Sequence, residues 1–267
     1  MRSKWLLLLG CIILLVMIGA SSWAAQARRA AQPAQRIDPK ARALVIQMSN
    51  YLQSLSGFSV HAETITAFNF PSGDKLHASR AVDLYLQRPN RIRANVISAN
   101  REVQFFYDGR QGFIYTPQQR YYAQFPASPT INQAIDQAQS RYGIVMPLLS
   151  LTRSDLATII LSRTNRGYYI GPSMVNGIRA QHVALRGQKL ELEIWIQDGP
   201  TPLPLMIITT EYKEKGAPSF IATLSCWNTA PTYTEDIFTF VPPSGAQKIK
   251  IKDFQEQTPR ARLRSRK

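Results

Sequence analysis

The stretch AVDLYLQRPNRIRANV, residues 81–96, decides the fold class of this 267-residue chain. Every second residue is apolar from 82 to 86 and again from 92 to 96, with the turn residues Arg88-Pro89-Asn90 between the two runs. A period of two places alternate side chains on opposite faces of a strand. The stretch therefore predicts two antiparallel strands that share one apolar face.

The same alternation extends over residues 57–125 in about six segments and resumes over residues 168–240, where Asn176-Gly177 marks a hairpin. The last strand is expected at 237–240. The strands do not alternate with helices, as they would in a parallel sheet. The predicted fold class is α+β, mainly β with helices: a single large curved antiparallel sheet of about eleven strands that forms an open half-barrel.

Two helical regions accompany the predicted sheet. Asp38-Pro39 is a typical helix start and predicts a helix from 39 to about 54. Between the two runs of strands, residues 131–142 place apolar side chains on one helical face. Residues 152–155 then resemble a capping box in front of a second apolar run. This insert is expected either to form a lid or to cap an ordinary core.

The two ends of the chain indicate its compartment. Residues 1–24 have the basic start, apolar run and small residues of a secretory signal peptide, and the apolar run is shorter than the roughly 20 residues that span a bilayer. We expect a periplasmic protein, the alternative being an uncleaved N-terminal segment that anchors the chain to the inner membrane. Residues 25–38 are expected to be a flexible linker, 39–251 the folded domain and 252–267 a basic disordered tail.

The charge of the chain is strongly positive, with 32 Lys and Arg against 17 Asp and Glu and a formal net charge of +15. Such an excess often indicates nucleic acid or an anionic membrane as partner. Here much of it lies in the signal peptide, the linker and the tail, and no element interleaves basic with aromatic residues for base stacking. We therefore expect no nucleic-acid partner. The tail either touches an anionic membrane surface or is inert and solvated.

The two cysteines are too few for a disulfide-rich scaffold. Cys226 is the one that lies beyond the signal peptide. It continues the alternation of Phe220, Ala222 and Leu224, and is therefore expected at a buried position on a strand.

Catalytic motifs are not evident. His61, His77 and His182 lack the spacing of a metal site. Glu191 and Glu193 share one face of a strand. The simpler interpretation is that this face is solvated and that the two glutamates form cross-strand ion pairs with Arg91 and Arg93. We expect no metal, no cofactor and no enzymatic activity, and keep a hydrolase that uses His182 and the two glutamates as a minor alternative.

Three groups of residues resemble those of periplasmic lipoprotein-carrier-like half-barrels. They are the hairpin around Asp108-Gly109 and Tyr115-Thr116-Pro117, the closing pattern Phe238-x-Phe240-x-Pro242-Pro243-x-Gly245, and the run from Asn176-Gly177 to Pro204. On their order and spacing, residues 39–251 are identified as a member of a narrower group in that superfamily. This group is DUF2092, predicted periplasmic proteins of unknown function.

The resemblance implies an open barrel of eleven strands with a helical lid over an apolar cavity that holds acyl chains. The expected lining is Val82, Leu84, Ile92, Val96, Val103, Phe105, Phe113, Tyr115, Leu192, Ile194, Ile196 and Leu224. Arg80, Arg91 and Arg93 are candidates, by position alone, for the functional arginine of the carriers. The implied protein is a monomer that binds a lipid or an acylated protein. The alternative is an envelope sensor or protein-binding module of the same fold, without lipid cargo.

Overall fold

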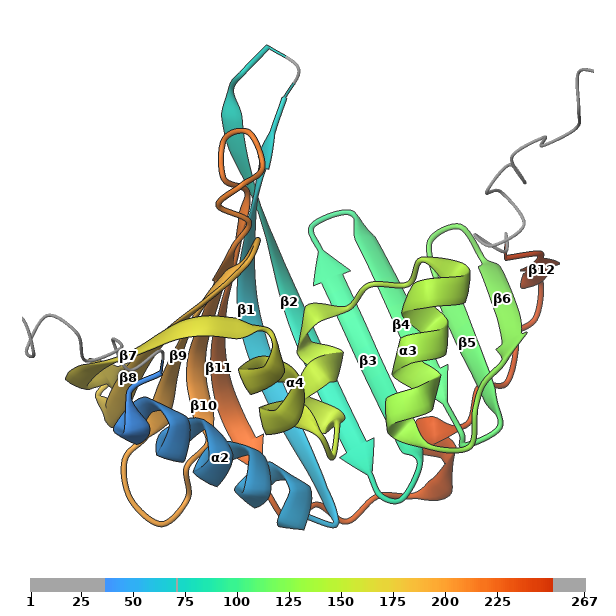
Figure 1. Ribbon diagram of the computed structural model, residues 1–267. Coiled ribbons are helices and arrows are strands. Elements are labelled where there is room, and N and C mark those ends of the chain that lie inside the picture. The colour runs from blue at the N-terminus through green and yellow to red at the C-terminus, as the bar shows by residue number, and fades with distance from the viewer. Residues whose placement is uncertain (1–36, 71, 252–267) are drawn as a thin grey trace, which may run out of the picture. The chain divides into compact units, whose positions relative to one another are not determined.

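The computed structural model describes residues 37–70 and 72–251. The expected signal peptide, nearly all of the linker and the basic tail lie outside the described residues. Within them, twelve strands form one curved, open sheet in the order β12-β6-β5-β4-β3-β2-β1-β11-β10-β9-β8-β7 (Figure 1). The predicted α+β half-barrel is confirmed.

The strands follow the predicted alternation closely. They are β1 (Gly57–Asn69), β2 (Lys75–Gln87), β3 (Arg91–Ser98), β4 (Arg101–Tyr107), β5 (Gln111–Thr116), β6 (Tyr121–Pro126), β7 (Thr164–Val175), β8 (Ile178–Gly187), β9 (Glu191–Gln197), β10 (Pro204–Thr210), β11 (Ser219–Asn228) and β12 (Gln247–Ile249). Neighbouring strands are antiparallel except for β6 and β12, which pair in parallel. The predicted hairpin at Asn176-Gly177 joins β7 to β8, and both residues have the positive φ that this turn requires.

The first described helix, α2 (Pro39–Ser54), begins where the sequence predicts. The side chain of Asp38 accepts hydrogen bonds from the backbone N–H groups of Lys40 (2.7 Å) and Ala41 (3.2 Å), and the proline follows directly. The helix lies against one face of the sheet, near β7 and β8 (Figure 1). Its buried apolar residues are Ala41, Val45, Met48 and Leu52. We call the face that it covers the concave face and the opposite face the convex face.

The register of β2, β3 and β4 builds the concave face from rows of apolar side chains. Residues that lie opposite each other on adjacent strands point to the same face, so each row continues across the three strands. The rows are Val82, Val96 and Val103; Leu84, Ala94 and Phe105; and Leu86, Ile92 and Tyr107. The predicted alternation of apolar and polar residues along these three strands is confirmed.

On β5 the expected assignment of faces was wrong. Tyr115 lies opposite Gln104 on β4, whereas Ile114 lies opposite the inward-facing Phe105. Phe113 and Tyr115 therefore point to the convex face, where both rings pack against Phe240 at 5.3 Å between centroids. Gly112 takes an inward position because the ring of Phe125 leaves no room for a Cβ atom there.

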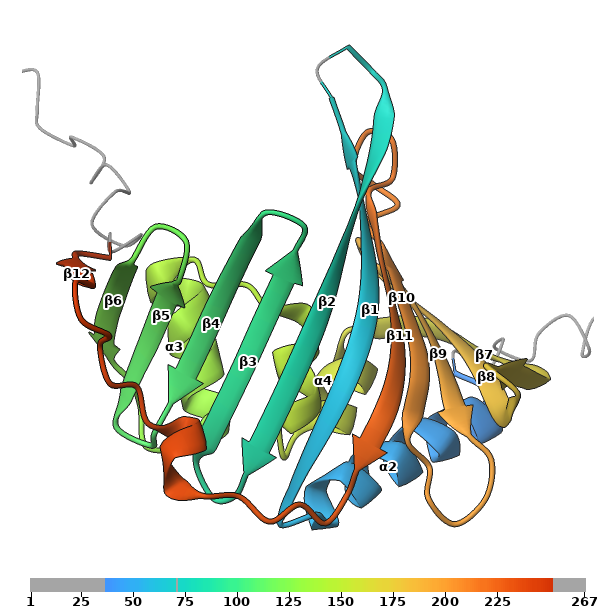
Figure 2. The same cartoon turned by 180° about the vertical axis from the view of Figure 1, so that it is seen from behind.

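The expected strand at 237–240 was also wrong. Residues Glu235–Phe238 form a short 3-10 helix, η2, and the chain crosses the convex face before it reaches β12 (Figure 2). We call residues 229–246 the C-terminal strap. Phe240 inserts among four aromatic rings of β4, β5 and β6, and the hydroxyl of Tyr233 donates a hydrogen bond to the Phe58 carbonyl oxygen (2.7 Å). These contacts hold the segment on the face of the sheet, where it cannot pair as a strand.

Cys226 is exposed, and the expectation of a buried position was wrong. The pairing of β1 with β11 shifts between Ser59 and His61, and Cys226 has a left-handed φ of +52° at this irregularity. A bulge inserts one extra residue and breaks the alternation. Trp227, one position later, takes the inward place and packs against Phe58, with ring centroids 5.3 Å apart.

Candidate functional site

Three short helices lie over the concave face, between β6 and β7 in the chain. They are α3 (Ile131–Tyr142), the 3-10 helix η1 (Pro147–Thr152) and α4 (Leu156–Ser162). Figure 1 shows them on the same side of the sheet as α2. We call residues 131–162 the helical roof. The helix at 131–142 is the one that the apolar periodicity predicts. The side chain of Thr130 caps it by accepting a hydrogen bond from the Gln133 N–H (3.4 Å).

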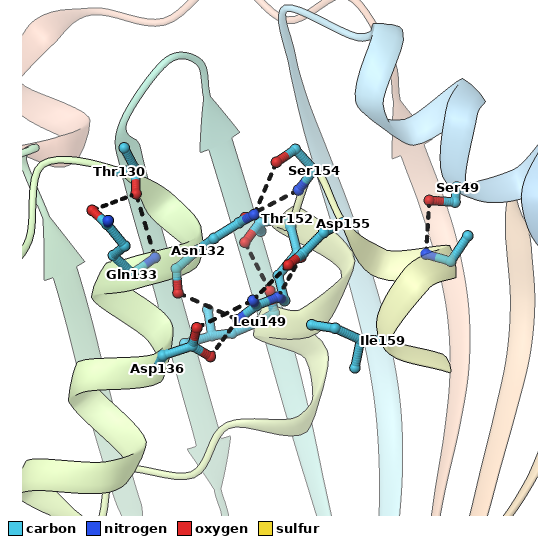
Figure 3. A network of polar contacts seen from close by, with 12 residues as sticks. Ser49, Thr130, Asn132, Gln133, Asp136, Leu149, Thr152, Ser154, Asp155 and Ile159 are labelled. Atoms are coloured by element: carbon cyan, nitrogen blue, oxygen red, sulfur yellow. Dashed lines mark hydrogen bonds and ion pairs between the residues drawn. The ribbon is translucent and has the colours of Figure 1, made fainter. Parts of the chain in front are cut away.

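A buried arginine ties the roof together. The guanidinium of Arg153, whose side chain is only 7% exposed, lies 2.7 Å from a carboxylate oxygen of Asp136 on α3 and 2.7 Å from one of Asp155. Both carboxylates are labelled in Figure 3. It also donates to the Asn132 carbonyl oxygen (3.3 Å). Hydrogen bonding from Arg153 lowers the pKa of Asp155, so this carboxylate stays ionised at neutral pH.

The same arginine explains why the expected capping box at 152–155 is not formed. Asp155 occupies the N-cap position of α4 but makes no capping hydrogen bond, because both of its oxygens face Arg153. The hydroxyl of Thr152 donates to the Leu149 carbonyl oxygen within η1. The Ala157 N–H at the start of α4 instead donates to the hydroxyl of Ser49, a buried residue of α2 (3.0 Å, Figure 3).

The first cavity lies between the roof, α2 and strands β7–β11, and has a volume of about 700 Å³. Aliphatic side chains make up much of its wall. They come from the roof (Leu148, Leu151, Leu156, Ile159, Ile160), from α2 (Met48) and from the sheet (Leu185, Leu192, Ile194, Ile207). This cavity, which we call the α4 cavity, has the size and character of a site for an apolar ligand.

The second cavity, of about 520 Å³, lies between the segment before and within η1 and strands β1–β4. Its floor includes Val82, Leu84, Ala94, Val96 and Val103, and Val145, Met146, Leu148 and Leu149 lie on the opposite side. We call it the η1 cavity. Leu148 and Phe220 line both cavities, so the two spaces are neighbours across these side chains.

The twelve residues expected to line a cavity fall into four groups. Val82, Leu84, Val96 and Val103 line the η1 cavity, and Leu192 and Ile194 line the α4 cavity. Ile92, Phe105, Ile196 and Leu224 are buried in the core and line neither. Phe113 and Tyr115 lie on the convex face, as described above.

Several lining residues were not expected from the sequence. Phe220 could have been found, because it alternates with Leu224 on β11. Met48 belongs to the buried face of α2, and Ile159 and Ile160 to the apolar run of α4. Their periodicity marks them as apolar but does not distinguish a cavity wall from a filled core.

The groups considered for catalysis lie on the convex face. A ring nitrogen of His182 lies 2.9 Å from a carboxylate oxygen of Glu193, and its ring stacks on Trp195 at 3.9 Å. Glu191 pairs with Arg186 on the adjacent strand (3.2 Å). The expected pairing of these glutamates with Arg91 and Arg93 was therefore wrong, since β3 and β9 lie in different halves of the sheet.

His61 lies between two carboxylates on the same convex face. Its ring nitrogens lie 2.8 Å from Asp83 and 3.2 Å from Glu63, and these hydrogen bonds raise the pKa of His61 above its usual 6.5. Within the part of the chain that the structure describes, no group of three or more His, Cys, Asp or Glu side chains is arranged to hold a metal ion.

One family model covers almost the whole of the described sheet and roof. It is the model of DUF2092, described as a predicted periplasmic protein, and it matches residues 41–252. The chain belongs to this family. The predicted family is thereby confirmed. Members of this family are described as predicted periplasmic proteins. Among residues 37–70 and 72–251, no helix combines the length and hydropathy needed to cross a bilayer.

Solved structures with a similar fold include an uncharacterised conserved protein from Thermus thermophilus, at 10% identity and a TM-score of 0.46 over 79% of this chain and 99% of that one. The Mycobacterium tuberculosis lipoprotein LppX is 16% identical, with a TM-score of 0.46 over 73% of this chain and 98% of LppX. LprF from Mycobacterium bovis is 16% identical, with a TM-score of 0.45 over 79% of this chain and all of LprF. No curated protein matches the chain in sequence.

Proposed function

We propose that this DUF2092 protein is an exported, non-catalytic envelope protein that binds the acyl chains of a lipid or of an acylated protein between its sheet and its helical roof. The observation that carries the proposal is the pair of adjoining cavities, of about 700 and 520 Å³, with largely aliphatic walls. A filled core would leave no such space, because protein interiors pack about as densely as organic crystals.

The chemistry of the walls favours binding over catalysis. The residues that line the two cavities include no histidine, cysteine or carboxylate. The histidines with carboxylate partners lie on the convex face, on the other side of the sheet. A bound acyl chain would be stabilised by about 0.8 kcal/mol for each CH₂ group that leaves water. Ten such groups would contribute roughly 8 kcal/mol, part of which offsets the entropy lost when the chain is bound and ordered.

The helical roof acts as the cover of the cavities in this proposal. It is held as a unit by Arg153 and is joined to α2 through Ser49 and Ala157. We further propose that a signal peptide at residues 1–24 exports the chain, that the tail at 252–267 touches anionic membrane, and that the protein acts as a monomer.

Charged substitutions on two strands, β3 and β10, test the proposal, and on each strand the neighbouring residue serves as an internal control. Val96 lines the η1 cavity, whereas its neighbour Ile97 points to the convex face and is 38% exposed. Ile207 lines the α4 cavity and its neighbour Ile208 does not. Binding of a fluorescent fatty acid is expected to weaken about tenfold or more in Val96→Asp and Ile207→Asp, because a carboxylate is costly next to an acyl chain. Ile97→Asp and Ile208→Asp should bind as the wild type does. Equal effects of both members of each pair, or no binding by the wild type, would contradict the proposal.

A second function is favoured by one specific feature, the edge of the sheet at β7 beyond Gly167, the residue with which Ile37 pairs. β7 is the last strand in the order, and Tyr168, Ile170 and Met174 on it are 50–64% exposed. An exposed edge strand can pair with an extended segment of a partner protein. In this alternative the chain is an envelope sensor or protein-binding module. The substitution Ile170→Pro would then abolish capture of the partner and leave fatty-acid binding unchanged.

A further inference from the structure

Along β2, the inward-facing apolar residues give way to a charged residue. On β2, Arg80 occupies the next inward position after Val82, at the point where the apolar row of the η1 cavity stops. It lies opposite Thr64, a buried residue whose hydroxyl donates to the Arg80 carbonyl oxygen (2.9 Å). The backbone of this arginine is thus fixed on the concave side, while its side chain is exposed at the rim of the cavity.

The neighbouring strands repeat this change from apolar to polar. Val96 and Val103 lie opposite each other, and one inward step further along the two strands Ser98 lies opposite Arg101. Arg101 is exposed, and Ser98 and Arg101 both line the η1 cavity. The floor of this cavity is therefore apolar on the inside and carries two guanidinium groups at one margin.

The α4 cavity has the same arrangement, built from different elements. Arg163 follows α4 directly, and Lys189 lies in the turn between β8 and β9. Both side chains are exposed and both residues line the cavity. Long basic side chains can lie along an apolar wall with their stems and keep the charged group in water.

All four basic residues lie at the same end of the sheet. Arg80 lies in the first half of β2, next to the last residue pair that β2 makes with β3 (Ala81 and Ile97), whereas Arg101 begins β4, Lys189 precedes β9 and Arg163 precedes β7. Because neighbouring strands from β6 to β7 alternate in direction, the starts of β2, β4, β7 and β9 share one end. This is the end beyond which the β1–β2 hairpin projects in Figures 1 and 2.

The four basic residues have no acidic counterpart in the cavity walls. Neither cavity has an Asp or Glu among its lining residues. Within the described part of the chain, none of the four basic side chains makes an ion pair. We call Arg80, Arg101, Arg163 and Lys189 the cationic rim.

From this arrangement we infer that the cationic rim binds the anionic headgroup of the ligand whose acyl chains fill the cavities, so that the cargo is an anionic amphiphile with a phosphate, sulfate or carboxylate group. The inference rests on the proposed function and narrows its ligand class. Guanidinium groups suit it because they bind phosphate and carboxylate oxygens with two parallel hydrogen bonds. Apolar walls next to a cationic margin match a molecule with apolar chains and an anionic head.

The test compares two probes with the same pyrene-labelled acyl chains, a phosphatidylglycerol and a diacylglycerol that lacks the phosphate. The wild type is expected to bind the phosphatidylglycerol at least about tenfold more tightly, since each basic group near an anionic lipid contributes about 1 kcal/mol. The variant Arg80→Gln/Arg101→Gln/Arg163→Gln/Lys189→Gln should bind the two probes within about threefold of each other. Arg166→Gln/Arg179→Gln, which removes two exposed charges that line neither cavity, is a control for loss of surface charge and should keep the preference.

Equal affinity of the wild type for both probes, or a preference that survives in the quadruple variant, would overturn the inference while leaving the proposed function intact. Failure of the wild type to bind either probe would overturn both. Inorganic phosphate at the concentration of the probe should not displace the phosphatidylglycerol. Displacement would assign the rim to free phosphate and would also overturn the inference. Circular dichroism of each variant verifies that it is folded.

Discussion

The guanidinium of Arg153 lies 2.7 Å from a carboxylate oxygen of Asp136, and this ion pair joins the segment before α4 to α3. The two residues are 17 positions apart in the chain, and the arginine is almost fully buried while the carboxylate is 64% exposed. With Asp155 on its other side, Arg153 holds the helices of the roof in one arrangement above the cavities. The stability of the roof should therefore depend on this side chain.

Replacement of Arg153 by methionine tests that dependence. We expect Arg153→Met to lower the free energy of unfolding by about 2 kcal/mol, because hydrogen bonds to charged groups are lost while methionine keeps part of the packing. Arg166→Met, at an exposed arginine of β7, is the control and should change stability by less than about 0.5 kcal/mol. Urea unfolding measures both. Equal stabilities of the two variants would contradict the role given to Arg153.

The C-terminal strap should contribute to stability mainly through one ring. Phe240 packs among Phe106, Phe113, Tyr115 and Tyr122, with centroids 5.3–5.4 Å away. Because this ring is only partly buried, Phe240→Ala is expected to cost about 2 kcal/mol, below the 3–5 typical of a fully buried phenylalanine.

The neighbouring residue gives the control for the strap. Val241 is 74% exposed, and Val241→Ala should be close to neutral in the same unfolding experiment. If Phe240→Ala were as stable as Val241→Ala, the strap would not be anchored by its aromatic contacts.

The sequence predicts those parts of the fold that depend on neighbours in the chain. Asp38 caps α2, Asn176-Gly177 forms its hairpin, and the alternation around Val82 and Val96 correctly marks the concave face. Each of these follows from residues a few positions apart, where propensity and period determine the structure.

The predictions failed where a distant residue decides the outcome. Phe113 and Tyr115 were expected inside because both faces of β5 carry apolar residues; the pairing of Ile114 with Phe105 and the contacts with Phe240 show which face is which. Thr152 and Asp155 were expected to form a capping box, but Arg153 binds the carboxylate of Asp155. The bulge at Cys226 depends on pairing with β1. Of the candidate site, the floor of each cavity was partly predictable, whereas the roof side required the three-dimensional structure.

The stability of the protein should depend on pH through His61. Its pKa is raised by hydrogen bonds to Asp83 and Glu63, so the folded state binds the proton more tightly than the unfolded chain does. The resulting stabilisation is fully present below about pH 6.5 and is lost as the pH rises through the higher pKa of the folded state. The wild type should therefore melt at a higher temperature than His61→Asn at pH 5.5, and this difference should shrink by pH 9. A difference that grows with pH would contradict the assignment.

Exposure of Cys226 gives a chemical test of the bulge. In the folded protein this thiol should react with a maleimide at a rate within about tenfold of the rate in urea, because it is solvent-accessible. The substitution Cys11→Ser leaves Cys226 as the one thiol that can react. Mass spectrometry then measures the rate of its modification. Strong protection of Cys226 in the native state would show that the alternation of β11 continues without a bulge.

The central claim, that acyl chains occupy the space between the sheet and the helical roof, is tested most directly by native mass spectrometry of the purified protein after incubation with phospholipid vesicles. The account predicts a species with one bound lipid for the wild type and for Ile97→Asp/Ile208→Asp, and its loss in Val96→Asp/Ile207→Asp. A wild type that stays folded and shows only the mass of the free chain at every vesicle concentration would contradict the claim.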